Sequence, residues 1–173
     1  MLSLIAAESA IFVIFVVAYL FYVGKSPSGP TPTVLRAPIF FSICLFSSSW
    51  TIHRAVTALK RGDLASFSRW WLATFVLGAL FLAGTGMEWR HLIVDENLTI
   101  HTNLFGTTYY SLVGLHAFHL TAGLLALGAV SLFAFFGHVK KEHTEKVDVL
   151  SIYWHFVDAV WVVVFLVVYV IGR

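Results

Sequence analysis

Apolar residues dominate five long stretches of the chain, each separated from the next by a short run rich in polar residues, glycine or proline. A helix needs about 20 mostly apolar residues to cross the hydrocarbon core of a bilayer, and all five stretches are long enough. No Lys or Arg precedes Lys25, and Glu8 interrupts the first stretch, so this stretch is predicted to be a retained span rather than a cleaved signal. The pattern predicts transmembrane helices at about residues 3–23, 37–57, 70–89, 107–136 and 150–171.

The connecting segments are short and contain residues that end helices. Residues 24–32 hold three prolines and two glycines, and Lys60-Arg61-Gly62-Asp63 separates the second stretch from the third. Short connections favour antiparallel neighbours in one bundle. We therefore predict an all-α polytopic membrane protein whose single transmembrane domain covers residues 1–173. Glycines within the spans favour close helix contacts, and those expected to make them are Gly78, Gly84, Gly86, Gly114, Gly123 and Gly128.

Composition supports lipid as the main solvent of the chain. Only 12% of its 173 residues are charged and 59% are hydrophobic, whereas a soluble domain carries roughly 25% charged residues. The net charge of +2 is too small, and its basic residues too scattered, to indicate a nucleic-acid partner. Cys44 is the only cysteine, so no intrachain disulfide can form.

The distribution of Lys and Arg between the two sides predicts the orientation. Cytoplasmic loops of membrane proteins carry an excess of these residues. Five spans place the termini on opposite sides, and the N-terminal side has seven basic residues against four. We therefore expect a cytoplasmic N-terminus and an outer C-terminus. The seven are Arg54, Lys60, Arg61, Arg69, Lys140, Lys141 and Lys146; the four are Lys25, Arg36, Arg90 and Arg173.

Six ionisable residues fall within the predicted spans, where a charge costs several kcal/mol, so each is a candidate for function. Glu8 shares a helix face with Phe12, Phe15 and Tyr19. It is interpreted either as a proton-exchanging carboxyl or as a neutral acid that hydrogen-bonds to a neighbouring helix. Glu88 is interpreted either as an interfacial acid or as the partner of a histidine on the fourth helix. The other four are His116, His119, His155 and Asp158.

The histidines raise the question of a metal or haem. His116 and His119 are neighbours on one helix face but offer only two ligands, where zinc takes three or four. A haem between His119 and His155 would require equal depth, and the predicted spans place them about 17 Å apart along the membrane normal. We therefore expect structural hydrogen bonding for the histidines, and no metal.

His155 and Asp158 stand one turn apart, so an imidazole and a carboxyl can share a hydrogen bond there. No nucleophile accompanies them, which favours a packing role over a catalytic one. The tryptophans and tyrosines near span ends are interpreted as an interfacial belt. They include Trp70, Trp71, Trp89, Tyr109, Tyr110, Tyr153, Trp154 and Tyr169.

Four segments, in the same order, resemble subunit III of the haem–copper oxidases. Residues 153–161, YWHFVDAVW, resemble the family's YWHFVDVVW run almost residue for residue, and Glu88-Trp89 matches a Glu followed by an aromatic residue. FGTTYY at 105–110 with GLHAFH at 114–119 resembles the family's G-S/T-T-F/Y-F/Y and G-F/L-H-x-x-H patterns. ESAIF at 8–12 resembles its glutamate-bearing helix, the third of seven in the usual form. The chain therefore resembles the short form with five helices.

The resemblance implies a non-catalytic accessory subunit in a bacterial-type cytoplasmic membrane. It implies that the chain packs against subunit I, which holds the haem and copper, in a complex that also contains subunit II. A larger respiratory assembly is a further candidate partner. The family binds phospholipid in a cleft and supports proton uptake and durable turnover. Glu8 becomes the buried carboxyl facing that cleft or the subunit I side, and this chain has no cofactor of its own. The implied headgroup contacts are Trp50, His53, Arg54, Arg61, His138, Lys141 and His143.

Three other functions remain open on sequence alone. One is an accessory subunit of a related nitric oxide reductase. A second is a stand-alone proton-conducting protein built around Glu8 and Asp158, which would move protons in vesicles. A third is a haem-binding membrane anchor, which would show a haem absorption band in the isolated subunit.

Overall fold

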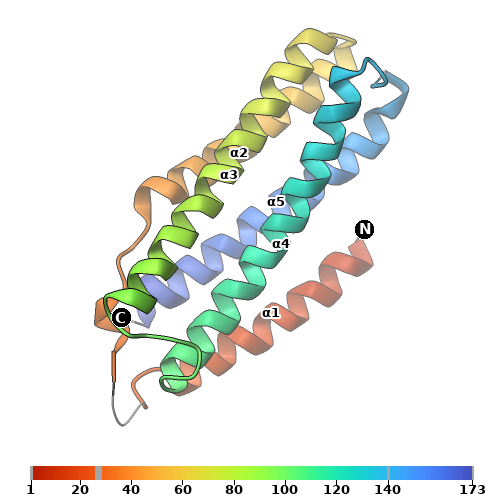
Figure 1. Cartoon of the computed structure of the whole chain (residues 1–173). Coiled ribbons are helices and arrows are strands. Elements are labelled where there is room, and N and C mark those ends of the chain that lie inside the picture. Colours follow the sequence, from red (N-terminus) through yellow and green to blue (C-terminus); the bar gives the residue numbers. More distant parts are fainter. Residues whose placement is uncertain (1, 26–28, 140, 173) are drawn as a thin grey trace. The chain divides into compact units, whose positions relative to one another are not determined.

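The computed structural model describes residues 2–25, 29–139 and 141–172, and within them it contains helices and no strand. Five helices are long and apolar enough to cross a membrane, which confirms the predicted all-α polytopic class (Figure 1). They are α1 (Leu2–Tyr22), α2 (Ile39–Arg61), α3 (Leu64–Val94), α4 (Leu104–Phe135) and α5 (Thr144–Phe165). Shorter elements are η1 (Pro32–Val34), η2 (Lys141–His143) and η3 (Leu166–Ile171), the last a π-helix that continues α5.

Three helices extend beyond the apolar stretches that predicted them. Helix α3 covers Leu64–Val94 where 70–89 was expected, α2 continues to Arg61, and α5 begins at Thr144 rather than near 150. The added turns contain polar residues such as Glu145 and Lys146. Intrahelical hydrogen bonds continue through residues that face water as well as through those that face lipid. Hydropathy alone therefore underestimates helix length.

The turn between α2 and α3 shows how the sequence ends one helix and begins the next. Gly62 adopts a positive φ of 81°, and its N–H donates to Leu59 O at 2.9 Å, while the N–H of Asp63 donates to Ala58 O at 3.0 Å. This pair of bonds is a Schellman motif. Asp63 then caps α3, because its Oδ1 accepts the Ser66 N–H at 3.0 Å. Hydrogen bonds from Ser66 also lower the pKa of Asp63 below its ordinary value.

The chain forms two compact units, and α3, α4 and α5 contribute one end to each. Unit 1 comprises residues 1–38, 84–118 and 159–173, and unit 2 comprises residues 39–83 and 119–158. Whether the chain is one transmembrane domain stays a prediction.

In unit 2, polar side chains connect four helical segments in a closed ring. The Thr51 and Thr74 hydroxyls lie 2.7 Å apart between α2 and α3, which run side by side (Figure 1). The Trp71 indole on α3 donates to Leu127 O on α4 at 3.0 Å, and Tyr153 on α5 donates to His119 O on α4 at 3.0 Å. The Trp154 indole on α5 returns to Ser48 on α2 at 2.8 Å. Each of the segments of α2, α3, α4 and α5 in this unit is therefore bonded to two others.

In unit 1, aromatic rings contact one another across elements. Tyr19 on α1 is fully buried and lies 6.3 Å from the Phe105 ring of α4, centroid to centroid. Trp89 on α3 meets Tyr110 on α4 edge to face at 5.5 Å. Ring–ring contacts of this geometry add to the area that the rings bury. Several members of the predicted interfacial belt instead belong to the core, because Trp71, Tyr109, Trp154 and Tyr169 are at most 5% exposed.

Candidate functional site

The first candidate site, in unit 2, is a chain of hydrogen bonds between α2 and α5. The Ser49 hydroxyl donates to the Asp158 carboxylate and lies 2.9 Å from Nδ1 of His155. Sequence spacing predicted a shared bond between His155 and Asp158. The structure inserts a serine from another helix between them. Asp158 is buried and His155 is exposed, so this series of hydrogen bonds leads from the interior to the surface of α5.

Trp154 fixes this part of α5 against three other helices. A Cβ built on Gly78 of α3 would lie 2.7 Å from the Trp154 ring, and one built on Gly123 of α4 would lie 3.0 Å from it. Both glycines therefore admit the indole, as predicted for close helix contacts. Gly86 differs from the prediction, because no atom lies within 4 Å of its Cβ position.

The second candidate site, in unit 1, surrounds Glu88. The Tyr169 hydroxyl, on η3, lies 2.9 Å from Oε1 and 3.1 Å from Oε2 of Glu88. Tyr169 itself is 5% exposed and packs against Phe165 and Trp161 at ring distances of 5.4 and 6.4 Å. The partner of this carboxyl is thus a tyrosine that sequence reasoning placed at the membrane interface, and not a histidine of the fourth helix.

The two histidines of α4 have different surroundings. His116 is 1% exposed and stacks on the Trp161 ring at 5.0 Å with an interplanar angle of 28°. His119 is buried, and its carbonyl accepts the Tyr153 hydroxyl. This bond brings His119 to the level of Tyr153, two residues before His155, so the predicted depth difference of about 17 Å is wrong. The rings of Tyr153 and Trp154 occupy the space beside Gly123, which lies one turn from His119 on α4.

Glu8 lies on α1 in a half-buried position. Phe12 and Tyr19 of the same face are buried, at 5% and 0% exposure, while Ile14 and Val17 on other faces are exposed at 66% and 58%. The face that Glu8 shares with Phe12 and Tyr19 is therefore the one that packs within unit 1.

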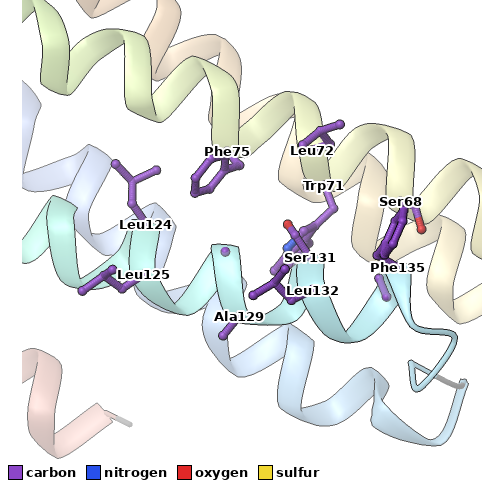
Figure 2. A pocket seen from close by; sticks show the side chains of 12 residues that line it. Ser68, Trp71, Leu72, Phe75, Leu124, Leu125, Ala129, Ser131, Leu132 and Phe135 are labelled. Atoms are coloured by element: carbon purple, nitrogen blue, oxygen red, sulfur yellow. The ribbon is translucent and has the colours of Figure 1, made fainter.

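An apolar cavity of about 780 Å³ lies between α3 and α4 in unit 2. Figure 2 shows Trp71, Leu72 and Phe75 of α3 on one side and the leucines and Phe135 of α4 on the other. Among the described residues that line it, the hydroxyls are those of Ser68 and Ser131. A cavity of this size and lining suits a hydrocarbon chain better than a polar ligand. Nothing in the sequence pattern distinguished its residues from ordinary packing positions.

Two of the basic residues predicted to contact headgroups, Arg54 and Arg61, lie together on the C-terminal half of α2. The Arg54 guanidinium lies 5.4 Å from the Trp50 ring and 5.6 Å from the Trp70 ring, within cation–π range. Arg54 and Arg61 line a small polar cavity of about 140 Å³ that also includes Asp63 and Ser66.

The remaining headgroup candidates are spread over α2 and the segment between α4 and α5. His53 on α2 and His138 are exposed, and His138 meets Phe136 edge to face at 6.5 Å. His143 is half-buried in η2, a segment that packs against α2. The side chain of Lys141 lies outside the described part of the structure. A role in binding lipid stays a prediction for all of these residues.

Among the described residues, no three His, Cys, Asp or Glu side chains are grouped as metal ligands would be. What the geometry presents is a multi-pass membrane protein whose spans are joined by polar side chains and which contains an apolar cavity. This arrangement defines a helical multi-pass membrane protein.

Comparison with known proteins identifies the family. Residues 5–173 match the family described as cytochrome c oxidase subunit III, and the chain belongs to that family. It is 39% identical to cytochrome c oxidase subunit 3 of Synechocystis over 172 residues, which cover 96% of this chain and 72% of the relative. The corresponding protein of Thermostichus vulcanus is 32% identical over 177 residues, covering 100% and 86%. A probable cytochrome c oxidase subunit 3 of Nocardia farcinica is 32% identical over 161 residues, covering 93% and 79%.

These matches confirm the resemblance drawn from the four sequence motifs. They make the chain a haem–copper oxidase subunit III and a multi-pass membrane protein that belongs to an oxidase complex with other subunits. None of them favours the nitric oxide reductase, proton channel or haem anchor alternatives.

Proposed function

We propose that this subunit III packs against subunit I of its oxidase, binds phospholipid, and sustains proton uptake and durable turnover without a cofactor of its own. Haem and copper would be held by subunit I, with subunit II completing the core in a bacterial-type cytoplasmic membrane. The observation that carries the proposal is the family match over nearly the whole chain. Exposed apolar side chains on all five long helices supply the surfaces that lipid and partner subunits would cover.

Purification of the tagged full chain in mild detergent tests the assembly. We expect it to co-purify with a large subunit that shows haem absorption and that mass spectrometry identifies as subunit I. A solitary, colourless chain recovered under conditions that keep other membrane complexes intact would contradict the proposal.

The apolar cavity between α3 and α4 supports the lipid part of the proposal. Replacing Ala129, which lines the cavity, with Trp would fill part of its 780 Å³. The matched control is Ala122→Trp, an exposed position on the same helix outside the cavity. We expect native mass spectrometry of the complex to show less bound phospholipid for Ala129→Trp than for Ala122→Trp. Equal lipid content in both variants would contradict a lipid site at this cavity.

Glu8 supports the proton-related part, since it is an ionisable group on the packed face of α1. We expect Glu8→Gln to leave assembly intact and to alter the turnover rate of the oxidase or shorten the time over which turnover is maintained. Glu142→Gln is the control, because Glu142 is exposed in η2 outside the spans. If Glu8→Gln and the unaltered complex turn over alike for equally long, Glu8 has only a structural role.

A further inference from the structure

Two polar atoms of unit 1 are buried without a direct hydrogen bond to any residue that the structure describes. They are the indole Nε1 of Trp89 on α3 and the hydroxyl of Tyr109 on α4. Tyr109 is 0% exposed. Folded proteins give almost every buried polar group a partner, either from the protein or from an ordered water molecule. Each of these two atoms therefore calls for a partner.

Both atoms belong to the cluster around the Glu88 carboxyl. The Tyr109 hydroxyl lies within interaction range of the Glu88 carboxyl and the Tyr169 hydroxyl. The Trp89 indole lies within the same range of Tyr109. None of these three contacts of Tyr109 reaches hydrogen-bond geometry. The ring of Tyr110 packs beside the cluster, 5.5 Å from the Trp89 ring and 5.2 Å from the Tyr109 ring.

Hydrogen-bond accounting shows what the missing partner must do. An indole N–H can only donate, so Trp89 needs an acceptor, whereas a tyrosine hydroxyl can donate or accept. The Glu88 carboxyl receives the Tyr169 hydroxyl at 2.9 and 3.1 Å. In either protonation state the carboxyl keeps lone pairs that can accept a further bond. The partner must therefore accept from the indole and donate to the carboxyl.

These two requirements identify the chemical class of the partner. A metal cation cannot accept a hydrogen bond from an indole N–H, and an anion without a proton cannot donate one to a carboxyl. A water molecule does both, and buried waters typically make about three hydrogen bonds to polar groups that lack other partners. The partner is also small and enclosed, because Tyr109 and Tyr169 are 0% and 5% exposed.

We propose that unit 1 binds an ordered water molecule between α3, α4 and η3. This water accepts hydrogen bonds from the Trp89 indole and the Tyr109 hydroxyl and donates one to the Glu88 carboxyl. It joins two spans and the π-helix through a single molecule. The inference concerns this chain alone, so it holds or fails independently of the contact with subunit I.

A density map of the full chain, alone or in its complex, at a resolution that shows ordered waters tests the site directly. We expect a separate peak within about 3.2 Å of Trp89 Nε1, the Tyr109 hydroxyl oxygen and a Glu88 carboxyl oxygen. A map without this peak, in which the indole or the Tyr109 hydroxyl bonds to the carboxyl directly, would overturn the proposal.

Removal of one hydroxyl tests the energetics. Deleting a buried hydroxyl that has no partner should leave the stability unchanged or raise it, whereas deleting one that bonds to a buried water should lower it. We expect Tyr109→Phe to lower the thermal unfolding midpoint of the full chain in mild detergent by about 2–4 °C. The control is Tyr22→Phe on α1, where the ring is 37% exposed, and its midpoint should match that of the unaltered chain. If Tyr109→Phe unfolds at or above the unaltered midpoint, no water is bound to this hydroxyl.

Discussion

The two units satisfy a membrane-embedded carboxyl in different ways. In unit 2, Asp158 receives the hydroxyl of Ser49, which in turn contacts an exposed imidazole, so the network is small and reaches the surface. In unit 1, Glu88 receives the hydroxyl of Tyr169, and the rings around that tyrosine enclose it. A hydroxyl donor serves both carboxyls. The two sites differ in the group next to the donor, which is an exposed imidazole for Ser49 and a cluster of aromatic rings for Tyr169.

This contrast separates two roles for polar groups in a membrane. A network that ends inside its own unit holds helices of one chain together. A network that ends at an exposed side chain, as that of Asp158 does at His155, is open to groups outside its own unit. Burial of the carboxyl alone does not explain the difference, since Asp158 is buried and Glu88 is half-buried, yet it is the network of Asp158 that reaches the surface. The exposure of the last group in each network does.

The largest expected effect is on the packing that supports the unit 2 network. Trp154→Ala removes an indole that is fully buried, fills the space beside two glycines and bonds to Ser48. Truncation of a buried Trp costs about 3–5 kcal/mol, which should appear as a large fall in the thermal unfolding midpoint of the full chain in mild detergent. Trp50→Ala is the control, because Trp50 is 56% exposed. If both variants lower the unfolding midpoint by a similar amount, Trp154 does not have this role in packing.

A direct comparison of the two donors comes next. Tyr169→Phe leaves the enclosed Glu88 carboxyl without its hydroxyl, and we expect a loss of about 1–2 kcal/mol in the free energy of unfolding. Ser49→Ala should cost less, about 0.5–1 kcal/mol, since His155 stands one turn from Asp158 and can reach it directly. Denaturation of each full-length variant in detergent measures both values. A larger loss for Ser49→Ala would reverse the distinction between the enclosed and the open network.

The glycines of α3 give a smaller and more local test. Gly78→Ala places a methyl 2.7 Å from the rigid Trp154 ring, whereas Gly86→Ala enters open space on the same helix. The first should lower stability by about 1 kcal/mol or more through overpacking. The second should be neutral or stabilising, because Ala is the better helix former. Thermal unfolding of the two variants side by side decides the matter, and equal behaviour would mean that α3 and α5 can separate slightly without loss.

The smallest effect concerns a carboxyl outside the membrane. Asp63 caps α3, and hydrogen bonds from Ser66 lower its pKa. Its folded-state pKa is below the unfolded value of about 3.9, so its stabilisation is complete above that pH and is lost as the pH falls through the lowered value. Asp63→Asn keeps a capping oxygen and does not titrate. We expect the difference in unfolding midpoint between the two proteins to change only in this acidic range; a constant difference would contradict the assignment.

The sequence predicted the long apolar helices and most residues of both networks, because hydropathy and helical spacing depend on local chemistry. It did not identify Ser49 or Tyr169 as the donors. A serine is ordinary in a membrane helix, and Tyr169 has the position expected of an interfacial aromatic residue. Both act through contacts between elements far apart in the chain, 109 residues for Ser49 and Asp158 and 81 for Tyr169 and Glu88. The predicted difference in depth between His119 and His155 was wrong for a related reason, because the prediction assumed that helices end where hydropathy falls.

The π-helix that ends the described chain has an evolutionary consequence. In an α-helix each residue turns the chain by about 100°, and a π segment accommodates roughly one extra residue within such a helix. A descendant that lost one residue anywhere between Leu166 and Tyr169 would therefore rotate the tyrosine away from the Glu88 carboxyl. We therefore expect homologues to keep the π-helix and the tyrosine together. Homologues that lack one of them should also carry another residue in place of Glu88.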